Sequence, residues 1–184
     1  MTISGDWTHA GGNFIAGTGN VIFVGSIYTT HSTISGNTTF YNLILQKENG
    51  SVGIIGSPST THLYLYDGVL ASGTILVSGN IIMNTEDGSH LFDGGGTSVV
   101  QLVSSSDQEI IVRNGSAFMP NLQINKPAGT VTLRNGNLDL EGRALILNQG
   151  ILDLNGFTVS TADFTHNGGI MRGTNGGSLN VSRN

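Results

Sequence analysis

Cysteine is absent from the 184-residue sequence, and charged residues are scarce. Without cysteine, the chain has neither a disulfide framework nor a thiolate zinc site. Seven Lys and Arg residues stand against twelve Asp and Glu residues without a basic cluster, which argues against a nucleic-acid partner. No apolar run approaches the roughly 18–20 residues that cross a bilayer, and the first residues lack the basic and apolar regions of a signal peptide. We therefore expect no membrane span.

Small polar residues dominate the composition instead. Gly, Ser, Thr and Asn number 28, 18, 19 and 18, which is about 45 % of the chain. These residue types are poor helix formers, so the composition argues against a helical protein. Disorder is also disfavoured, because 38 % of the residues are hydrophobic and the net charge is only −5. The sequence therefore predicts an all-β fold.

Apolar residues recur at a step of seven in the second half of the chain. The step begins at Val131 and continues through Leu138, Leu145, Leu152 and Val159. Within each unit the next apolar residue follows at i+2, which is strand alternation, whereas a coiled coil needs apolar positions three apart. Turn-forming residues such as Asn and Gly separate the apolar triplets. The unit is a strand of three or four residues followed by a short turn.

Two architectures can use this unit. In a parallel β-solenoid, three sides of about seven residues form a coil of about 21 residues, whereas in an antiparallel sandwich or meander the six Asn-Gly pairs would form hairpin turns. We favour the solenoid, because strands this short make weak hairpins but pair along a whole stack of coils. Asn and Gly then stand at corners that need φ > 0. The solenoid predicts outward Asp139, Ile146 and Asp153. It predicts six inward leucines: Leu138, Leu140, Leu145, Leu147, Leu152 and Leu154.

A longer repeat of about 78 residues also runs through the chain. Three pairs of segments match: residues 6–12 (DWTHAGG) with 163–169 (DFTHNGG), residues 40–47 (FYNLILQK) with 118–126 (FMPNLQINK), and residues 73–79 (GTILVSG) with 150–156 (GILDLNG). The members of the first pair are separated by twice the long period. We predict one solenoid domain over residues 1–184, built from a partial repeat (1–16), two full repeats (17–95 and 96–172) and a second partial repeat (173–184). Neither end contains a recognisable cap.

Three of these segments resemble a known group of proteins. Residues 121–133 (NLQINKPAGTVTL), 150–160 (GILDLNGFTVS) and 17–23 (GTGNVIF) are similar to repeats in large secreted bacterial surface proteins, especially Bacteroidetes-like ones. The resemblance implies a right-handed parallel β-helix and an extracellular, structural or adhesive role. It carries over no active-site residue. The first copy departs from the pattern, since residues 57–61 are inserted where the second copy turns directly.

Few side chains are arranged for acid-base chemistry. Asp139 and Asp153 flank the inward leucines, but they are two steps of seven apart, which puts them on different sides of a three-sided coil. The densest cluster places Glu86, Asp87 and Asp93 around His90, in a turn-rich stretch. Polysaccharide-active β-helices need carboxylates that converge on one face. We expect surface and turn roles for these residues and predict no catalytic site.

Metal and ligand sites are equally sparse. His9 and His166 occupy matching positions of the long repeat but would lie several coils apart, too far to share an ion. Residues 92–97 (FDGGGT) lack the repeated array of a calcium-binding nonapeptide, and paired threonines do not recur in every coil as an ice-binding surface requires. The side chains that could stack on sugars are aromatic: Trp7, Tyr28, Tyr41, Tyr64 and Tyr66. We expect these aromatics to cover coil edges, and we predict no metal and no cofactor.

These observations favour a non-enzymatic extracellular structural protein. It would serve as a stalk, scaffold or filament subunit that stacks head to tail on copies of itself or on neighbouring repeats of a longer chain. A carbohydrate-binding adhesin at the cell surface is the alternative, and a polysaccharide-active enzyme is the less favoured third reading. Exposed aromatics along one face would indicate sugar binding, and two carboxylates about 5–10 Å apart in a groove would indicate an enzyme.

Overall fold

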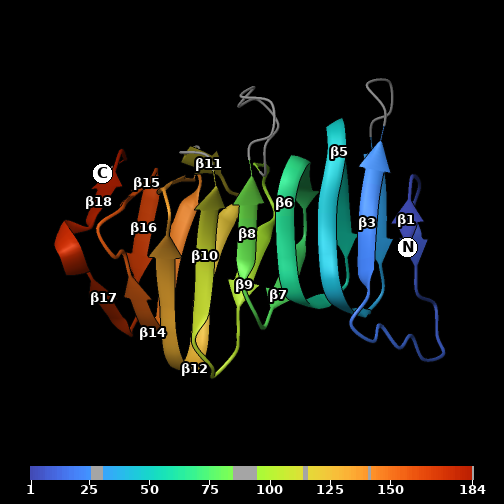
Figure 1. Ribbon diagram of the computed structural model, residues 1–184, viewed down its shortest axis with the longest axis horizontal. Coiled ribbons are helices and arrows are strands. Elements are labelled where there is room, and N and C mark those ends of the chain that lie inside the picture. Colours follow the sequence, from blue (N-terminus) through green and yellow to red (C-terminus); the bar gives the residue numbers. More distant parts are fainter. Residues whose placement is uncertain (26–30, 85–94, 114–115, 141, 184) are drawn as a thin grey trace.

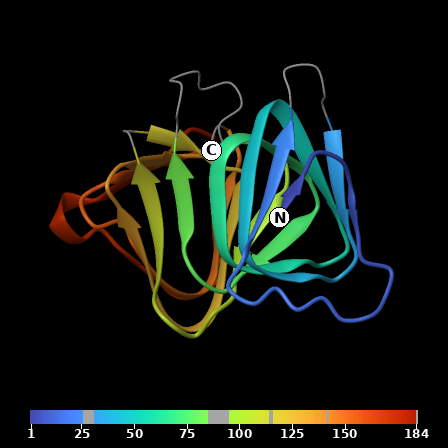
Figure 2. The same cartoon turned by 45° about the vertical axis from the view of Figure 1, so that its right-hand side comes forward.

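The computed structural model of the protein describes residues 1–25, 31–84, 95–113, 116–140 and 142–183. The described residues form an all-β solenoid of about eight turns, each of about 21 residues. Every strand pairing among these residues is parallel. The two ends of the chain lie at opposite ends of the stack (Figure 1), and the stacking is visible from a second direction in Figure 2. The β-solenoid is thus confirmed, and the antiparallel sandwich or meander is wrong.

Each coil has three sides. The strands of the first and third sides each pair in a continuous column, whereas the column of the second side is divided between two sheets among the described residues. The first side contains β1 (Thr2–Ile3), β3 (Asn20–Gly25), the middle of β5 (Thr39–Ile55) and of β6 (Ser59–Ser72), β8 (Ile81–Asn84), β10 (Gln108–Arg113), the end of β12 (Asn121–Arg134) and of β14 (Ala144–Asp153), and β17 (Ile170–Arg172). The long strands bend at the corners and so contribute to more than one side.

The other two sides are built in the same way. The second side contains β2 (Trp7–Thr8), β4 (His31–Ser35), the ends of β5 and β6, and then β11 (Ser116–Phe118), β13 (Asn137–Asp139), β15 (Thr158–Thr161) and β18 (Ser178–Val181). The third side contains the starts of β5 and β6, β7 (Thr74–Val77), β9 (Val99–Leu102), the starts of β12 and β14, and β16 (Asp163–His166). A short 3₁₀ turn (Thr174–Gly176) joins β17 to β18. Among the described residues, no helix is long and apolar enough to cross a bilayer.

The inward and outward faces follow the seven-residue step. The five residues that begin each unit of this step are all buried, and they fall in turn on the first, second, third, first and second sides: Val131, Leu138, Leu145, Leu152 and Val159. The six leucines predicted to point inward are at most 2 % exposed. Ile146, Asp139 and Asp153 are only partly buried, as expected for outward positions. The predicted orientation of these side chains is confirmed.

Asparagine occupies one corner of three successive coils. Asn135, Asn155 and Asn175 have φ values of 68°, 47° and 56°, and each is followed by glycine. Asparagine tolerates this left-handed conformation better than most residues, because its short polar side chain can hydrogen-bond locally. The Asn175 side-chain amide donates to Oδ1 of Asn155 at 2.8 Å, and the Asn155 amide donates to the Leu133 carbonyl. These three Asn-Gly pairs therefore form a ladder of corners rather than hairpin turns.

The N-terminal end of the core is covered by aromatic side chains. The rings of Trp7, Phe14 and Phe40 pack edge to face, with centroids 4.9–6.0 Å apart. The indole N–H of Trp7 donates to Oγ1 of Thr38 at 2.9 Å. Residues 9–19 contain no strand, and Phe14 comes from this segment. Trp7 and Phe14 thus form the end of the apolar core over Phe40, and among the described residues β1 and β2 pair only with the following coil, so the strand edges at this end are unpaired.

The C-terminal end is open. Among the described residues, β16, β17 and β18 pair only with the preceding coil. The inward side chains of this last coil are only partly buried: Phe164, Met171 and Leu179. Ile170 and Val181 are 50 % and 42 % exposed. One edge of each terminal strand and one end of the apolar core therefore face outward.

The segments that match at the long spacing lie on different sides of the coil. Leu43 is on the first side, where it pairs with Val21 and Leu63, whereas its sequence counterpart Leu122 is on the third side. Trp7 pairs in the second-side column, and Phe164 pairs in the third-side column. The long period is not a whole number of coils, so matched segments do not stack on one another.

Replacing Leu145 by Asp should cost several kcal/mol of unfolding free energy, because it buries a carboxylate without a partner in the core. The adjacent outward variant, Ile146→Asp, should cost much less, since its carboxylate can reach water. Urea denaturation followed by circular dichroism measures both. Equal losses in the two variants would contradict the assigned inward and outward faces.

Replacing Asn155 by Ala should cost about 2 kcal/mol, from the left-handed backbone and from the lost ladder hydrogen bonds. Asn155→Gly removes the same hydrogen bonds but relieves the backbone, so it should cost about half as much. Thermal and urea unfolding of the two variants separate these contributions. A glycine variant that is less stable than the alanine variant would be inconsistent with the corner geometry.

Candidate functional site

The carboxylates on the flanks of the inward leucines have different environments. Oδ1 of Asp153 accepts hydrogen bonds from the Asn155 backbone N–H at 2.9 Å and from the Thr174 hydroxyl at 2.5 Å. Asp153 therefore holds the corner that follows β14. Asp139 ends β13 on the second side, whereas Asp153 ends β14 on the first. The prediction that these two residues lie on different sides is confirmed, and the structure does not bring them together.

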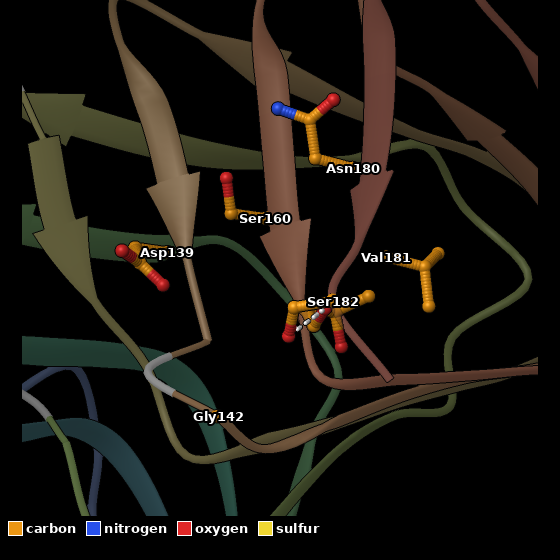
Figure 3. Close-up of a pocket in the computed structure, with 7 residues that line it drawn as sticks. Asp139, Gly142, Ser160, Asn180, Val181 and Ser182 are labelled. Atoms are coloured by element: carbon orange, nitrogen blue, oxygen red, sulfur yellow. Dashed lines mark hydrogen bonds between the residues drawn. The ribbon is translucent and has the colours of Figure 1, made fainter. Parts of the chain in front are cut away.

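Asp139 instead lines a hollow of about 310 Å³ at the carboxyl ends of three neighbouring parallel strands. Figure 3 shows Asp139, Ser160 and Asn180 on adjacent strands β13, β15 and β18. The strand register puts these three residues in one row, because Asp139 pairs with Ser160 and Ser160 pairs with Asn180. The rest of the lining comes from the last residues of β15 and β18, Thr161 and Val181, and from Gly142 and Ser182 outside the strands.

The row at the hollow differs from the row two residues earlier on the same strands. In the earlier row, Oδ1 of Asn137 accepts from the Thr158 backbone N–H at 2.9 Å, and the Thr158 hydroxyl bonds to the Ser178 hydroxyl at 2.9 Å. The Ser160 and Asn180 side chains make no hydrogen bond to any part of the chain that the structure describes. At the hollow, therefore, the side-chain hydrogen bonds that join Thr158 to Ser178 are not repeated between Ser160 and Asn180.

The two histidines that match in sequence lie on different sides of the coil. His9 follows β2, and its backbone N–H donates to the Ser35 carbonyl at 3.0 Å. His166 ends β16, where its ring stacks on Phe164 and Nε2 lies 3.3 Å from the Gly169 carbonyl. They are separated by almost the whole length of the stack and form no pair. In the described ranges, no group of three or more His, Cys, Asp or Glu side chains could hold a metal ion.

The aromatic candidates have mainly structural contacts. Trp7 covers the N-terminal end of the core. Tyr41 packs edge to face with His62, and Tyr64 packs in the same way with Tyr66, both at 5.7 Å between centroids. All four aromatic candidates here are partly buried. The remaining candidates lie outside the described residues: Tyr28 and the cluster of Glu86, Asp87, His90 and Asp93.

Two buried lysines are the feature that the sequence analysis missed. Lys126 is fully buried, and its Nζ donates to the Ser104 and Ser106 carbonyls at 2.7 Å and to Oε1 of Gln108 at 2.6 Å. Lys47 is 1 % exposed, and its Nζ lies 3.4 Å from the Val24 carbonyl. Three carbonyl-type acceptors can hold an ammonium group inside the protein without a carboxylate.

The signal for these lysines was present in the alternation. Lys47 stands two residues after inward Leu45, and Lys126 stands two residues after inward Ile124, so both fall in the inward phase of their strands. Glycine makes room for their side chains, since a Cβ at Gly50 would lie 2.7 Å from Cγ of Lys47. Both lysines stand where a long strand turns a corner. The Lys126 ammonium bonds to carbonyl oxygens at the corner of the preceding coil, so it links the corners of two successive coils. Their role is to fix corners.

Burial lowers the pKa of Lys126 and of Lys47, and the carboxylates of Asp107 and Asp6, respectively, partly oppose this shift. With a lowered pKa in the folded state, the unfolded chain binds more protons than the folded chain between the folded pKa and about 10.5. The free energy of unfolding therefore increases as the pH rises through that range. Below the folded-state pKa both states are protonated, and the lysine no longer makes the stability depend on pH. The chain has no cysteine that would titrate in the same range.

We therefore expect the free energy of unfolding to rise as the pH increases toward about 10.5 and to rise less steeply in Lys126→Met. Arg134→Met is the control, because Arg134 forms an exposed ion pair with Glu109 at 3.0 Å. Urea unfolding at a series of pH values gives the slope for each variant. A slope unchanged by Lys126→Met but changed by Arg134→Met would refute the assignment of the pH dependence to the buried lysines.

Comparison of the chain with protein-family models, with curated proteins and with solved structures found no match in any of the three. The fold itself is a parallel β-solenoid of about eight turns. Three features of the molecule bear on its function: the open C-terminal coil, the buried lysines at the corners and the hollow at Asp139.

Proposed function

We propose that the chain is a non-enzymatic structural segment of an extracellular bacterial surface protein, a stalk, scaffold or filament subunit. Its coils stack end to end, either on the next repeat of a longer chain or on a second copy. The resemblance of residues 121–133 and 150–160 to repeats of secreted surface proteins supports the extracellular location. The single observation that carries the proposal is the open C-terminal coil.

Three strands of that coil have an unpaired edge within the described residues, which makes them a template for a further parallel coil. The partly buried Phe164, Met171 and Leu179 would continue the apolar columns of the core into that coil. A coil added here would hydrogen-bond its strands and bury apolar surface at the same time. Head-to-tail contacts of this kind extend without closing into a ring.

The outer surface also suits stacking of like on like. Neutral side chains bond to their equivalents one coil away, as Asn42 does to Asn20 at 2.7 Å and Thr39 does to Ser59 at 2.9 Å. Charged residues are only 10 % of the chain, so a further coil would meet little repulsion from repeated like charges. These features support a scaffold whose length is set by the number of stacked coils.

The proposal includes a right-handed coil and the long sequence repeat. Three coils on the first side lead from Leu43 through Leu63 and Ile81 to Ile110, and two more sides lead to Leu122, the sequence counterpart of Leu43. Trp7 and Phe164 are separated by seven coils and one side, which is twice this displacement. Successive repeats would thus be rotated by one side. The third matched pair, residues 73–79 and 150–156, is one side short of the same relation.

Stacking through the C-terminal coil predicts self-association that a charge in the terminal apolar column abolishes. In sedimentation velocity over a hundredfold concentration range, the chain should form species larger than a monomer. Met171→Lys places an ammonium in the exposed end of the core and should leave a monomer. Ile170→Lys changes the adjacent outward residue and should associate like the unchanged chain.

A tandem chain of two copies tests the covalent form of the same proposal. If the second copy stacks on the open coil, the tandem chain should unfold in one transition at a higher temperature than the single chain. A single chain that stays monomeric at every concentration, together with a tandem chain that unfolds as two independent units, would rule out stacking in both forms.

A further inference from the structure

The hollow at the carboxyl ends of β13, β15 and β18 has the composition of a ligand site. Its volume of about 310 Å³ is near the lower limit for small-molecule sites, so it suits a molecule of about one sugar ring. Asp139, Ser160 and Asn180 come from three neighbouring strands (Figure 3). Neighbouring strands are about 4.8 Å apart, so the row spans about 10 Å.

Two residues of this row have unused hydrogen-bonding capacity. Ser160 and Asn180 make no side-chain hydrogen bond within the described ranges, although the parallel row through Thr158 and Ser178 is joined at 2.9 Å. Ser160 offers a hydroxyl that both donates and accepts, and Asn180 offers two donors and an acceptor. Strand pairing fixes the backbone of both residues, so their side chains project from neighbouring positions of one row.

The charges of the lining select the class of ligand. Among the described residues, seven line the hollow, and these include one carboxylate, Asp139, and no Lys or Arg. An anion would be repelled by Asp139, and a bare divalent cation needs more oxygen ligands than one carboxylate and a few neutral groups provide. Hydroxyl groups of a neutral sugar both donate and accept, so they can donate to Asp139 and also bond to Ser160 and Asn180.

An aromatic residue extends the same row. Phe118 pairs in register with Asp139 on the strand opposite Ser160, so the row reads Phe118, Asp139, Ser160, Asn180. Phe118 is partly exposed. An apolar ring beside polar groups matches a sugar ring, which has C–H faces and a hydroxyl rim.

We infer that this hollow binds a single neutral sugar unit, with Asp139 accepting from hydroxyl groups and with Ser160 and Asn180 forming the remaining hydrogen bonds. The inference goes beyond the structural role proposed above and is independent of stacking. A ligand of this size held by a shallow site should bind with a dissociation constant on the order of 1–10 mM.

Titration of the ¹⁵N-labelled full chain with D-glucose, D-galactose, D-mannose and N-acetyl-D-glucosamine tests it. At least one sugar should give saturable amide shifts confined to residues of β13, β15 and β18 near the hollow. Asn180→Ala and Ser160→Ala should each weaken binding about fivefold, the effect of one hydrogen bond. Ser178→Ala on the same strand, outside the hollow, should bind like the unchanged chain.

Both test variants change outer-face side chains, and Asn180 is exposed on a terminal strand, so we expect the fold to be kept. Unchanged spectra away from the substitution verify this directly. The inference is overturned if none of the four sugars gives saturable shifts at the hollow. It is also overturned if the shifts persist with equal affinity in Asn180→Ala and Ser160→Ala, or if Ser178→Ala weakens binding as much as they do.

Discussion

Parallel, in-register pairing between successive coils is the constraint on which the rest of the structure depends. Leu138 pairs with Val159, and Val159 pairs with Leu179, so each residue meets its equivalent one coil further along the chain. A position that points inward in one coil therefore points inward in the next. Apolar columns form when Leu, Ile or Val recurs at the same position of each coil, because every coil contacts only its neighbours. The buried Val131, Leu138 and Leu145 show that this repetition also links the three sides of the coil.

The same constraint explains why the chain carries so little charge. Like residues stacked about 4.8 Å apart would place like charges side by side, and cross-strand repulsion destabilises a sheet. Amides and hydroxyls avoid this penalty, since each both donates and accepts, and the Asn175–Asn155 and Thr158–Ser178 contacts use this property. Where exposed charges do occur on neighbouring coils, opposite signs meet, as for Arg134 and Glu109 at 3.0 Å. The buried ammonium group of Lys126 is instead surrounded by carbonyl oxygens, which stabilise its positive charge.

The sequence predicted the features that depend on the period within one coil. It did not predict which side of the coil a distant residue occupies, because that depends on the summed lengths of all the coils between. Alternation and the step of seven were enough to place the inward leucines and the Asn-Gly corners, because these are properties of one coil. The phase of His9 relative to His166 was not accessible in this way. Coil length varies, since Leu63 pairs with Ile81 but Ile81 pairs with the much more distant Ile110, so a match in sequence does not fix the side. The contact between Trp7 and Phe14 was also missed, since residues 9–19 depart from the period.

In a molecule built on self-satisfying ladders, the informative positions are those at which a ladder is left incomplete. The open C-terminal coil is incomplete along the stacking axis, since Phe164, Met171 and Leu179 lack the apolar neighbours that the same columns have in earlier coils. The hollow at Asp139 is incomplete on the outer surface, since Ser160 and Asn180 do not bond to each other as Thr158 and Ser178 do. The first kind of incompleteness is repaired by more β-structure, because it exposes backbone groups and apolar side chains together. The second is satisfied by water or by a polar ligand, because the Ser160 and Asn180 side chains have no hydrogen-bond partner among the described residues. Stacking and ligand binding can therefore coexist in one solenoid, as they draw on different faces of the same strands.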